Sequence, residues 1–301
     1  MGAFQTVFVT GATGFVGRVV IHALRAEGFK VRCLVRRGSE HDLRGQEAIE
    51  RVEGDVLVRQ TLDEGMGGCD AVVHLVGIIR EHRRRGITFE RLHVDATLNV
   101  LGAATAAGVR RYLHMSALGA SASARSQYHQ TKWLAEEAVR ASALPWTIFR
   151  PSIMYGKGDA FVSMLAGMIR RLPVVPIVGE GRQRLQPIPV EQVAEAFQRA
   201  LSRPDTIKQI YDVGGPAAVT MVELLDAIGH ALGHRHVRKV HLPIALMRTL
   251  AAVLQTIPAF PLTTDQIAML GEDNTCDPAP FSRAFNLTPV PLQAGLERLF
   301  A

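Results

Sequence analysis

Three residues in the middle of the chain have the types and spacing needed for proton transfer. Tyr128 and Lys132, in YHQTK, are four positions apart, which places them on one face of a helix. A tyrosine of ordinary pKa is almost wholly protonated near neutral pH, so it acts as a base only where positive charge stabilises its phenolate. Lys132 can supply that charge, and Ser116 can hydrogen-bond a substrate carbonyl or hydroxyl. The set predicts acid–base catalysis; a tyrosine and a lysine on a solvated helix surface is the alternative.

A glycine-rich turn near the start of the chain has the composition of a phosphate-binding loop. In TGATGFVG, residues 10–17, Gly11, Gly14 and Gly17 lie between a predicted strand and a predicted helix. Glycine is needed where such a loop bends tightly, where its backbone approaches a pyrophosphate, and where the helix packs against the strand. The free N–H groups and positive dipole end of the helix then face the anion. The turn predicts a bound dinucleotide; a tight turn without a ligand is the alternative.

The residues after the second predicted strand favour NADP(H) over NAD(H). An acidic side chain there would bind the adenosine ribose hydroxyls of NAD. CLVRRGSE instead has Arg36 and Arg37 at this place, with no carboxylate before Glu40. Guanidinium groups match a ribose phosphate, although two solvated loop charges would give the same sequence. After the third strand, Asp55 could hydrogen-bond the adenine amino group and Val56 could pack beside the ring.

Strands and helices alternate through the first half of the chain. Strands are expected at 6–10, 30–36, 49–56, 70–78, 111–117, 145–156 and 209–215. Helices are expected at 14–28, 89–109, 130–142 and 190–204. This alternation predicts an α/β fold with a Rossmann-type doubly wound parallel sheet and a smaller, mostly helical C-terminal lobe. Residues 1–155 with 186–215 would form the dinucleotide-binding domain, and residues 156–185 with 216–301 a lobe for substrate or partner.

Composition and charge exclude several classes of protein. Of the 301 residues, 34 are Lys or Arg and 28 are Asp or Glu, without the long basic stripe of a nucleic-acid surface. Three scattered cysteines predict neither disulfides nor a metal site. No signal segment precedes the first strand, so a cytoplasmic location is expected. The apolar stretch 242–262 contains Arg248 and three prolines, so we expect a buried or partner-facing helix there instead of a transmembrane segment.

Together these motifs resemble the short-chain dehydrogenase/reductase superfamily. The resemblance is carried by TGATGFVG, by GDV, by Ser116 with YxxxK, and by RPSIMYG at 150–156. HLVGI (74–78), HMSALGA (114–120) and PLTTDQIAMLGEDN (261–274) further resemble its atypical, extended branch, which is epimerase/dehydratase-like and includes the dehydrogenase-like accessory subunit of respiratory complex I. The resemblance covers nearly the whole chain. Ordinary members have an Asn-Ala-Gly-like turn after the fourth strand, where this chain has HLVG.

The resemblance implies roles for individual residues. Ser116, Tyr128 and Lys132 match the catalytic set. The implied cofactor contacts are Gly11, Thr13, Gly14, Phe15, Gly17, Arg36, Arg37, Asp55, Val56, Leu75, Val76, Gly77, Tyr128, Lys132, Pro151, Ser152 and Ile153. Within this set, Arg36 would meet the NADP phosphate, and the residues at 75–77 and 151–153 would border the nicotinamide.

Two classes of function follow. In the first, the protein is an NADP(H)-dependent oxidoreductase or an epimerase/dehydratase relative that acts on a small molecule or a quinone, with Tyr128 as general acid and base. A sugar-nucleotide enzyme would need diphosphate-binding residues in the lobe, for which Arg182 and Arg184 are candidates. In the second, the protein is a non-catalytic NADPH-carrying accessory or assembly subunit, held at the inner membrane by a respiratory-complex partner. The basic loop 81–93 suits an acidic substrate or an anionic partner, and both a dimer and a monomer fit the sequence.

Overall fold

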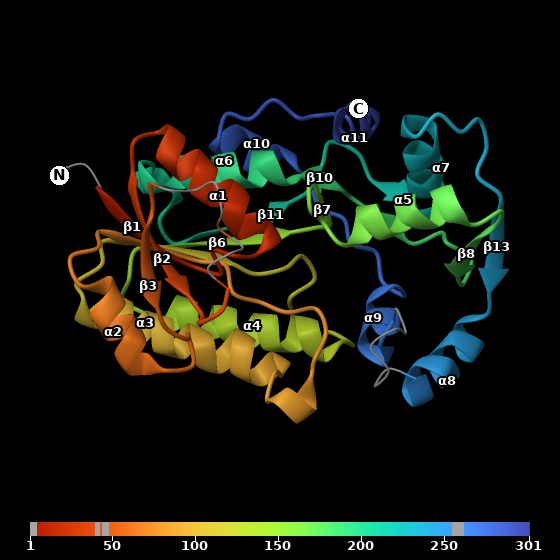
Figure 1. Cartoon of the computed structure of the whole chain (residues 1–301). Helices are drawn as coiled ribbons and strands as arrows, with labels where there is room; N and C mark the ends of the chain where they lie inside the picture. Colours follow the sequence, from red (N-terminus) through yellow and green to blue (C-terminus); the bar gives the residue numbers. More distant parts are fainter. Residues whose placement is uncertain (1–4, 40–42, 44–47, 255–261) are drawn as a thin grey trace.

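The computed structural model describes residues 5–39, 43, 48–254 and 262–301. At its centre lies a seven-stranded sheet in the order β11-β6-β5-β4-β1-β2-β3, in which every neighbouring pair is parallel (Figure 1). Its strands are β1 (Thr6–Thr10), β2 (Lys30–Val35), β3 (Glu50–Glu53), β4 (Ala71–His74), β5 (Arg111–Met115), β6 (Trp146–Pro151) and β11 (Gln209–Val213). The strand order reverses between β1 and β4. In open parallel sheets a ligand crevice forms at such a reversal, outside the carboxyl ends of the strands.

Helices cover both faces of the sheet, because each parallel crossover has to return the chain to the same end. One face carries α1 (Phe15–Ala26) and α6 (Val190–Leu201), which pack against each other. The other face carries α2 (Arg59–Met66), α3 (Ala96–Ala106) and α4 (Gln127–Ala141) (Figure 1). The prediction of a Rossmann-type doubly wound sheet is confirmed.

The two faces of the sheet have separate apolar cores. On the α1 face, Val20, Ile21 and Leu24 are fully buried at helical spacing, as the amphipathic pattern predicts. On the α3 and α4 face, Tyr112 of β5 and Ile148 of β6 are fully buried. Strands that are buried on both faces read as continuous apolar runs, which explains why AVVH and WTIFRP could be identified from the sequence.

The C-terminal region is largely helical, as predicted. Its helices are α5 (Phe161–Arg171), α7 (Met221–Ala231), α8 (Ile244–Leu254), α9 (Thr264–Met269), α10 (Ala279–Ala284) and α11 (Leu292–Phe300). Three two-stranded pairs join them: β8 (Val175–Val178) with β13 (Lys239–Leu242), β9 (Arg184–Leu185) with β12 (Val219–Thr220), and β7 (Met154–Tyr155) with β10 (Ile188–Pro189). Phe281 and Phe285 pack into the α1-face core of the sheet, so the chain returns to the sheet after leaving it. The assignment of residue ranges to two domains stays a prediction.

Some local predictions need correction. The helix α2 was not expected, because RQTLDEGM has only two large apolar residues. The strand expected at 70–78 ends at His74, and the residues after it form a loop. In α8 only Met247 and Ala251 are buried, so of the two expected forms, a buried helix or a partner-facing one, the described structure does not show a buried helix. Residues 255–261 of the same stretch lie outside the described residues. Among the helices that the structure describes, none combines the length and apolarity needed to span a bilayer.

Candidate functional site

The glycine turn after β1 has the backbone geometry of a phosphate cradle. Gly11 has φ +74°, and a Cβ there would lie 2.9 Å from the backbone carbon of Leu75. A Cβ on Gly17 would lie 2.2 Å from the carbonyl oxygen of Gly11, so the first turn of α1 packs directly on the loop. Gly14 is exposed and begins α1 without a side-chain cap. These glycines leave the N-terminus of α1 open, and the cradle fits a dinucleotide pyrophosphate.

The other residues of the predicted adenosine end lie beside this turn. Arg36 and Arg37 follow β2 and are exposed, and neither has an ion-pair partner in the part of the chain that the structure describes. The N–H of Gly54 donates to the carbonyl of Val35 (3.0 Å), which brings the loop after β3 next to the two arginines. Asp55 is half-buried, and its Oδ1 accepts from the N–H of Leu57 (2.9 Å). Val56 is buried beside it.

Lys132 of α4 is a buried cation at the end of β5. Its Nζ donates to the carbonyl of Met115 (3.1 Å), and a Cβ on Gly77 would lie only 2.8 Å from Nζ. The ammonium group therefore lies directly against the backbone of the loop after β4, at its glycine. Burial lowers the pKa of Lys132 to about 8, while the charge of Glu136 opposes this shift.

Ser116 follows β5 directly, and Tyr128 lies in the first turn of α4. The Ser116 side chain is buried, and its Oγ has no hydrogen-bond partner among the described residues. The Tyr128 ring has edge contacts with the rings of Phe89, His93 and His129, with centroids 5.9, 5.4 and 5.1 Å away. Burial, with a smaller effect of the Asp265 charge, raises the pKa of Tyr128 to about 12.

The helix α4 carries both Tyr128 and Lys132, but the two side chains are not hydrogen-bonded to each other in the described structure. Tyr128 and Lys132 lie one turn apart on it, but no hydrogen bond links the Tyr128 hydroxyl to Lys132 or to Ser116 within the described ranges. The helix is fixed on β6 by Glu136, which is fully buried and receives two hydrogen bonds from Arg150 (2.8 and 2.6 Å). Lys132 thus lies at the end of β5, and the catalytic roles expected for Ser116, Tyr128 and Lys132 stay a prediction.

The residues after β4 and β6 lie at the carboxyl ends of these strands, the edge at which parallel sheets bind ligands. Leu75 is buried against Gly11, Val76 is half-buried, and Gly77 is exposed. After β6, Pro151 is buried and its carbonyl accepts from the N–H of Leu118 (3.0 Å). Among the remaining candidates, Thr13, Phe15 and Ile153 are half-buried around the crevice. Contact of all these residues with a cofactor stays a prediction.

Two residues of the C-terminal region reach this site and were not identified as contacts from the sequence. Asp265 of α9 accepts from the backbone N–H groups of Gln127 (2.7 Å) and Tyr128 (3.3 Å), at the start of α4. Asn274 accepts from the Ser152 hydroxyl (2.5 Å) and donates to the carbonyl of Leu118 (3.0 Å). Both lie in PLTTDQIAMLGEDN, a segment noted only for its resemblance, and no local pattern indicates which distant backbone they contact.

Asp265→Ala should destabilise the protein by about 1 kcal/mol, because two N–H groups at the start of α4 lose their acceptor. Asp63→Ala is a suitable control, since Asp63 makes only an exposed pair with Arg59 (2.7 Å) and should cost less than about 0.5 kcal/mol. Urea unfolding of both variants measures the difference. Equal losses would show that Asp265 does not act as a cap.

Three buried histidines surround Lys132. His74 donates from Nε2 to Thr97 (3.1 Å), because the Thr97 hydroxyl itself donates to a carbonyl (2.6 Å), and its Nδ1 accepts from Thr10 (2.6 Å). His93 contacts Thr131 (2.8 Å) through Nδ1. For His114, neither ring nitrogen has a partner in the described part of the chain. Burial, reinforced by the Lys132 charge, lowers the pKa of all three, to about 3 for His74 and about 2 for His93.

A basic loop lies next to the start of α4. Arg83, Arg84 and Arg85 are exposed in a short 3-10 turn after β4. Arg83 pairs with Glu81 (2.7 Å) and donates to the side-chain oxygen of Gln127 (3.4 Å). The predicted position of this loop beside the crevice is therefore supported by a direct contact with α4. Its two other arginines are available to an anionic substrate or partner.

Comparison with known proteins gives relatives over most of the chain. Subunit 9 of the NADH dehydrogenase [ubiquinone] 1 alpha subcomplex, mitochondrial, from Arabidopsis thaliana is 32% identical over 287 residues, covering 91% of this chain and 69% of that protein. Ceramide reductase from Caulobacter vibrioides is 32% identical over 238 residues, covering 79% of this chain and 73% of that protein. The structure of UDP-glucuronic acid 4-epimerase from Bacillus cereus with UDP-glucuronic acid and NAD superposes with a TM-score of 0.76 at 17% identity, covering 98% of both chains.

The last comparison shows the fold alone, since its sequence identity is low. The model of the NAD dependent epimerase/dehydratase family matches residues 7–214, which include the glycine turn, β5, α4 and β6. With this match and the two relatives at 32% identity, the chain belongs to the NAD dependent epimerase/dehydratase family.

Proposed function

We propose that this protein is an NADP(H)-dependent oxidoreductase that interconverts a carbonyl group and a hydroxyl group. The observation that carries the proposal is the buried Oγ of Ser116, which lacks a partner among the described residues beside the ammonium group of Lys132. Buried hydroxyls are normally hydrogen-bonded. This one is therefore available to hold the oxygen of a substrate. An epimerase or dehydratase relative would use the same groups on a hydroxyl.

The three polar groups divide the work of carbonyl reduction. A reduced nicotinamide held at the glycine turn would supply the hydride that the carbonyl carbon needs. Tyr128 gives its hydroxyl proton to the carbonyl oxygen, Ser116 donates a hydrogen bond to the same oxygen, and the product is an alcohol. Because burial raises the pKa of Tyr128 to about 12, the phenol holds its proton at neutral pH and is ready to act as an acid. The ammonium group of Lys132, one helical turn away, stabilises the phenolate that remains.

The choice of NADP(H) is supported by charge at the end of β2. Arg36 and Arg37 are exposed next to the loop of Asp55 and carry no ion-pair partner within the described residues. A ribose phosphate beside them would receive charge-assisted hydrogen bonds. NAD offers two hydroxyls at that position, which gain much less from a guanidinium.

Replacing both Arg36 and Arg37 with alanine should weaken NADPH binding about 10- to 100-fold and NADH binding less than about threefold, because each charge-assisted bond to phosphate contributes about 1.5 kcal/mol. Fluorescence titration of both nucleotides measures the two constants. The control is Arg235→Ala with Arg238→Ala, which removes the same charge from exposed positions in the lobe. An equal loss for NADPH and NADH would contradict recognition of the phosphate.

The proposed function is tested on the purified protein in two steps. Bound nucleotide is extracted and identified by mass, and NADPH oxidation is then followed with quinones, aldehydes, ketones and sugar nucleotides. NADPH-dependent turnover of a carbonyl substrate is the expected result. Tight NADPH without turnover on any of these classes would overturn the catalytic proposal.

That second outcome would favour a non-catalytic NADPH-carrying subunit of a respiratory complex, held at the inner membrane by its partners. The observation that favours this candidate is the similarity to a mitochondrial NADH dehydrogenase subunit over 91% of the chain. The exposed arginines after β4 would then face an anionic partner surface. The absence of a Tyr128–Lys132 hydrogen bond in the described part of the fold is also compatible with a carrier.

A further inference from the structure

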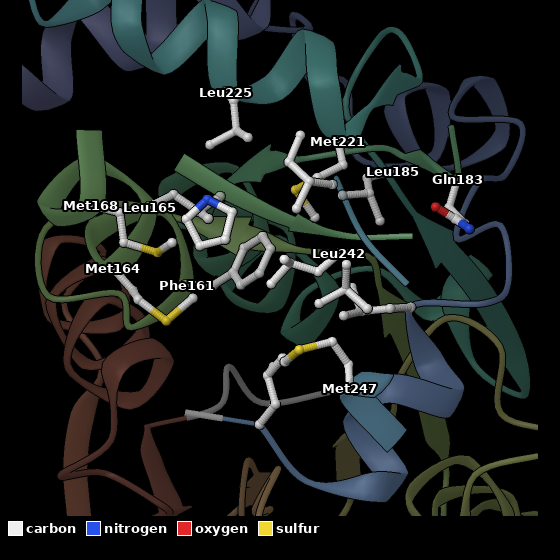
Figure 2. Close-up of a pocket in the computed structure, with 15 residues that line it drawn as sticks. Phe161, Met164, Leu165, Met168, Gln183, Leu185, Met221, Leu225, Leu242 and Met247 are labelled. Carbon is white, nitrogen blue, oxygen red and sulfur yellow. The ribbon is translucent and has the colours of Figure 1, made fainter. Parts of the chain in front are cut away.

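The C-terminal region contains an apolar cavity of about 150 Å³, separate from the cofactor crevice. Its walls come from α5, β8, α7 and the segments around β13 and α8, and Figure 2 shows side chains of these elements converging on one space. Of its 15 lining residues, Gln183 is the one with a polar side chain. The interior of this cavity is therefore chemically close to hydrocarbon.

This lining disfavours a charged occupant. In the described part of the chain, no Lys, Arg, Asp or Glu lines the cavity. The two arginines that could have bound a diphosphate are turned elsewhere: Arg182 is exposed and pairs with Glu180 (3.2 Å), and Arg184 lies exposed on β9. Burying a phosphate or a sugar here would leave its polar groups without partners, which costs several kcal/mol. The occupant that fits is uncharged and apolar.

The flexible walls of the cavity suit an adaptable hydrocarbon chain. Met164, Met168, Met221 and Met247 contribute flexible side chains to its walls (Figure 2). Methionine adapts to irregular contents more readily than branched residues do. A cavity of comparable volume in another protein holds one benzene molecule, so this one has room for a segment of about six carbon atoms.

The cavity shares an element with the proposed active site. Leu262 and Leu270, which line it, lie on either side of α9. Asp265 of α9 accepts from the N–H of Tyr128 at the start of α4. A molecule whose tail lies in the cavity would thus have its other end directed along α9 towards the Tyr128 helix.

We propose that this cavity binds the hydrocarbon chain of the substrate, while the carbonyl or hydroxyl group of the same molecule lies at Ser116 and Tyr128. This substrate class, a carbonyl or hydroxyl compound with an aliphatic or prenyl tail, rests on the oxidoreductase function proposed above. The cavity itself can be tested without turnover.

The test uses straight-chain methyl ketones from butanone to dodecanone, which displace the apolar fluorescent probe N-phenyl-naphthylamine from the protein. Affinity should rise about fourfold for each added methylene group and level off after about six carbon atoms, when the cavity is full. Met247→Trp fills the cavity and should weaken decanone binding at least 10-fold. Its control is Leu246→Trp, the neighbouring residue on α8, whose side chain is 50% exposed and should leave binding unchanged. Met221→Trp is a second blocking variant from another wall.

The outcomes separate the two proposals. Affinity that does not depend on chain length, or equal effects of Met247→Trp and Leu246→Trp, would overturn the cavity proposal. NADPH oxidation that depends on Tyr128 but not on ketone length would also overturn it, while keeping the oxidoreductase function. Chain-length-dependent binding that Met247→Trp abolishes supports the cavity as a hydrocarbon site, even where no ketone is reduced and the oxidoreductase function fails.

Discussion

Tyr128→Phe should lower kcat for carbonyl reduction by about 10²- to 10⁴-fold, the range lost with a general acid. The change removes only the hydroxyl, which has no hydrogen-bond partner among the described residues, and keeps the ring contacts with Phe89, His93 and His129. Stability and NADPH affinity should therefore stay close to those of the unmodified protein. Steady-state kinetics, a thermal melt and a nucleotide titration measure the three properties.

Tyr155→Phe is the matched control for this prediction. The Tyr155 hydroxyl has no hydrogen-bond partner in the described part of the chain and is buried in the core of the C-terminal region. The control should retain kcat within about twofold. A small effect of Tyr128→Phe would remove the phenol from the mechanism, and equal losses in both variants would indicate a general effect of removing a buried hydroxyl.

The pH dependence of the unmodified protein adds a second criterion. The pKa of Lys132 is lowered to about 8 by burial, so its positive charge is lost as the pH rises through that value. The phenolate then loses its stabilisation, and the rate should fall above about pH 8 although the phenol itself, with a pKa of about 12, still holds its proton. A rate that stays constant to pH 10 would show that Lys132 does not assist Tyr128.

The parts of this site that could be predicted from sequence are those set by local structure. Gly14 and Gly17 pack on the carbonyl of Gly11 within the same turn, and Gly11 itself has a positive φ, so the spacing of the three glycines indicates the turn. The four-residue spacing of Tyr128 and Lys132 likewise places both on one face of α4. The spacing of two residues in the sequence does not, however, determine which group the end of a long side chain contacts. Lys132 extends to the carbonyl of Met115 instead of the phenol, because Gly77 leaves space there.

The parts that could not be predicted depend on contacts between distant residues. Asp265 caps the start of α4 from 137 positions away, and Asn274 joins Leu118 from 156 positions away. Their side chains are common in loops, and nothing near them in sequence indicates a partner. The sequence also left open whether α8 is buried or exposed, since an apolar composition fits both a buried helix and a partner-facing one.

The protein should lose about 4 kcal/mol of unfolding free energy between pH 7 and pH 5 through His74 and His93 alone. Their folded-state pKa values are lowered to about 3 and about 2, below the unfolded value of about 6.5. In this pH range His74 and His93 are therefore protonated in the unfolded chain and neutral in the folded protein. The stability from these groups is complete above about pH 6.5 and is lost as the pH falls towards 3. Urea unfolding at a series of pH values measures it.

His114→Leu tests whether buried imidazoles cause this loss. His114 has no hydrogen-bond partner among the described residues, so its replacement should change stability little at pH 7. The unfolded chain would then take up one proton fewer, so the slope of unfolding free energy against pH should decrease by about 1.4 kcal/mol per pH unit. His234→Gln, at an exposed position, should leave the slope as it is. A slope that His114→Leu does not change would show that His114 takes up no proton on unfolding, and the prediction would then depend on His74 and His93.

Lys132→Met distinguishes the two causes that keep these histidines neutral. Burial is the larger cause for His74, His93 and His114, and the charge of Lys132 is a smaller one. Most of the acid sensitivity should therefore remain in Lys132→Met, although the proposed catalysis is lost. A protein that became insensitive to acid would show that repulsion from the ammonium group keeps the imidazoles neutral. With either cause, the three histidines are neutral at neutral pH and Lys132 carries the positive charge beside them. Lys132 lies on the same helix as Tyr128, where a positive charge can stabilise a phenolate.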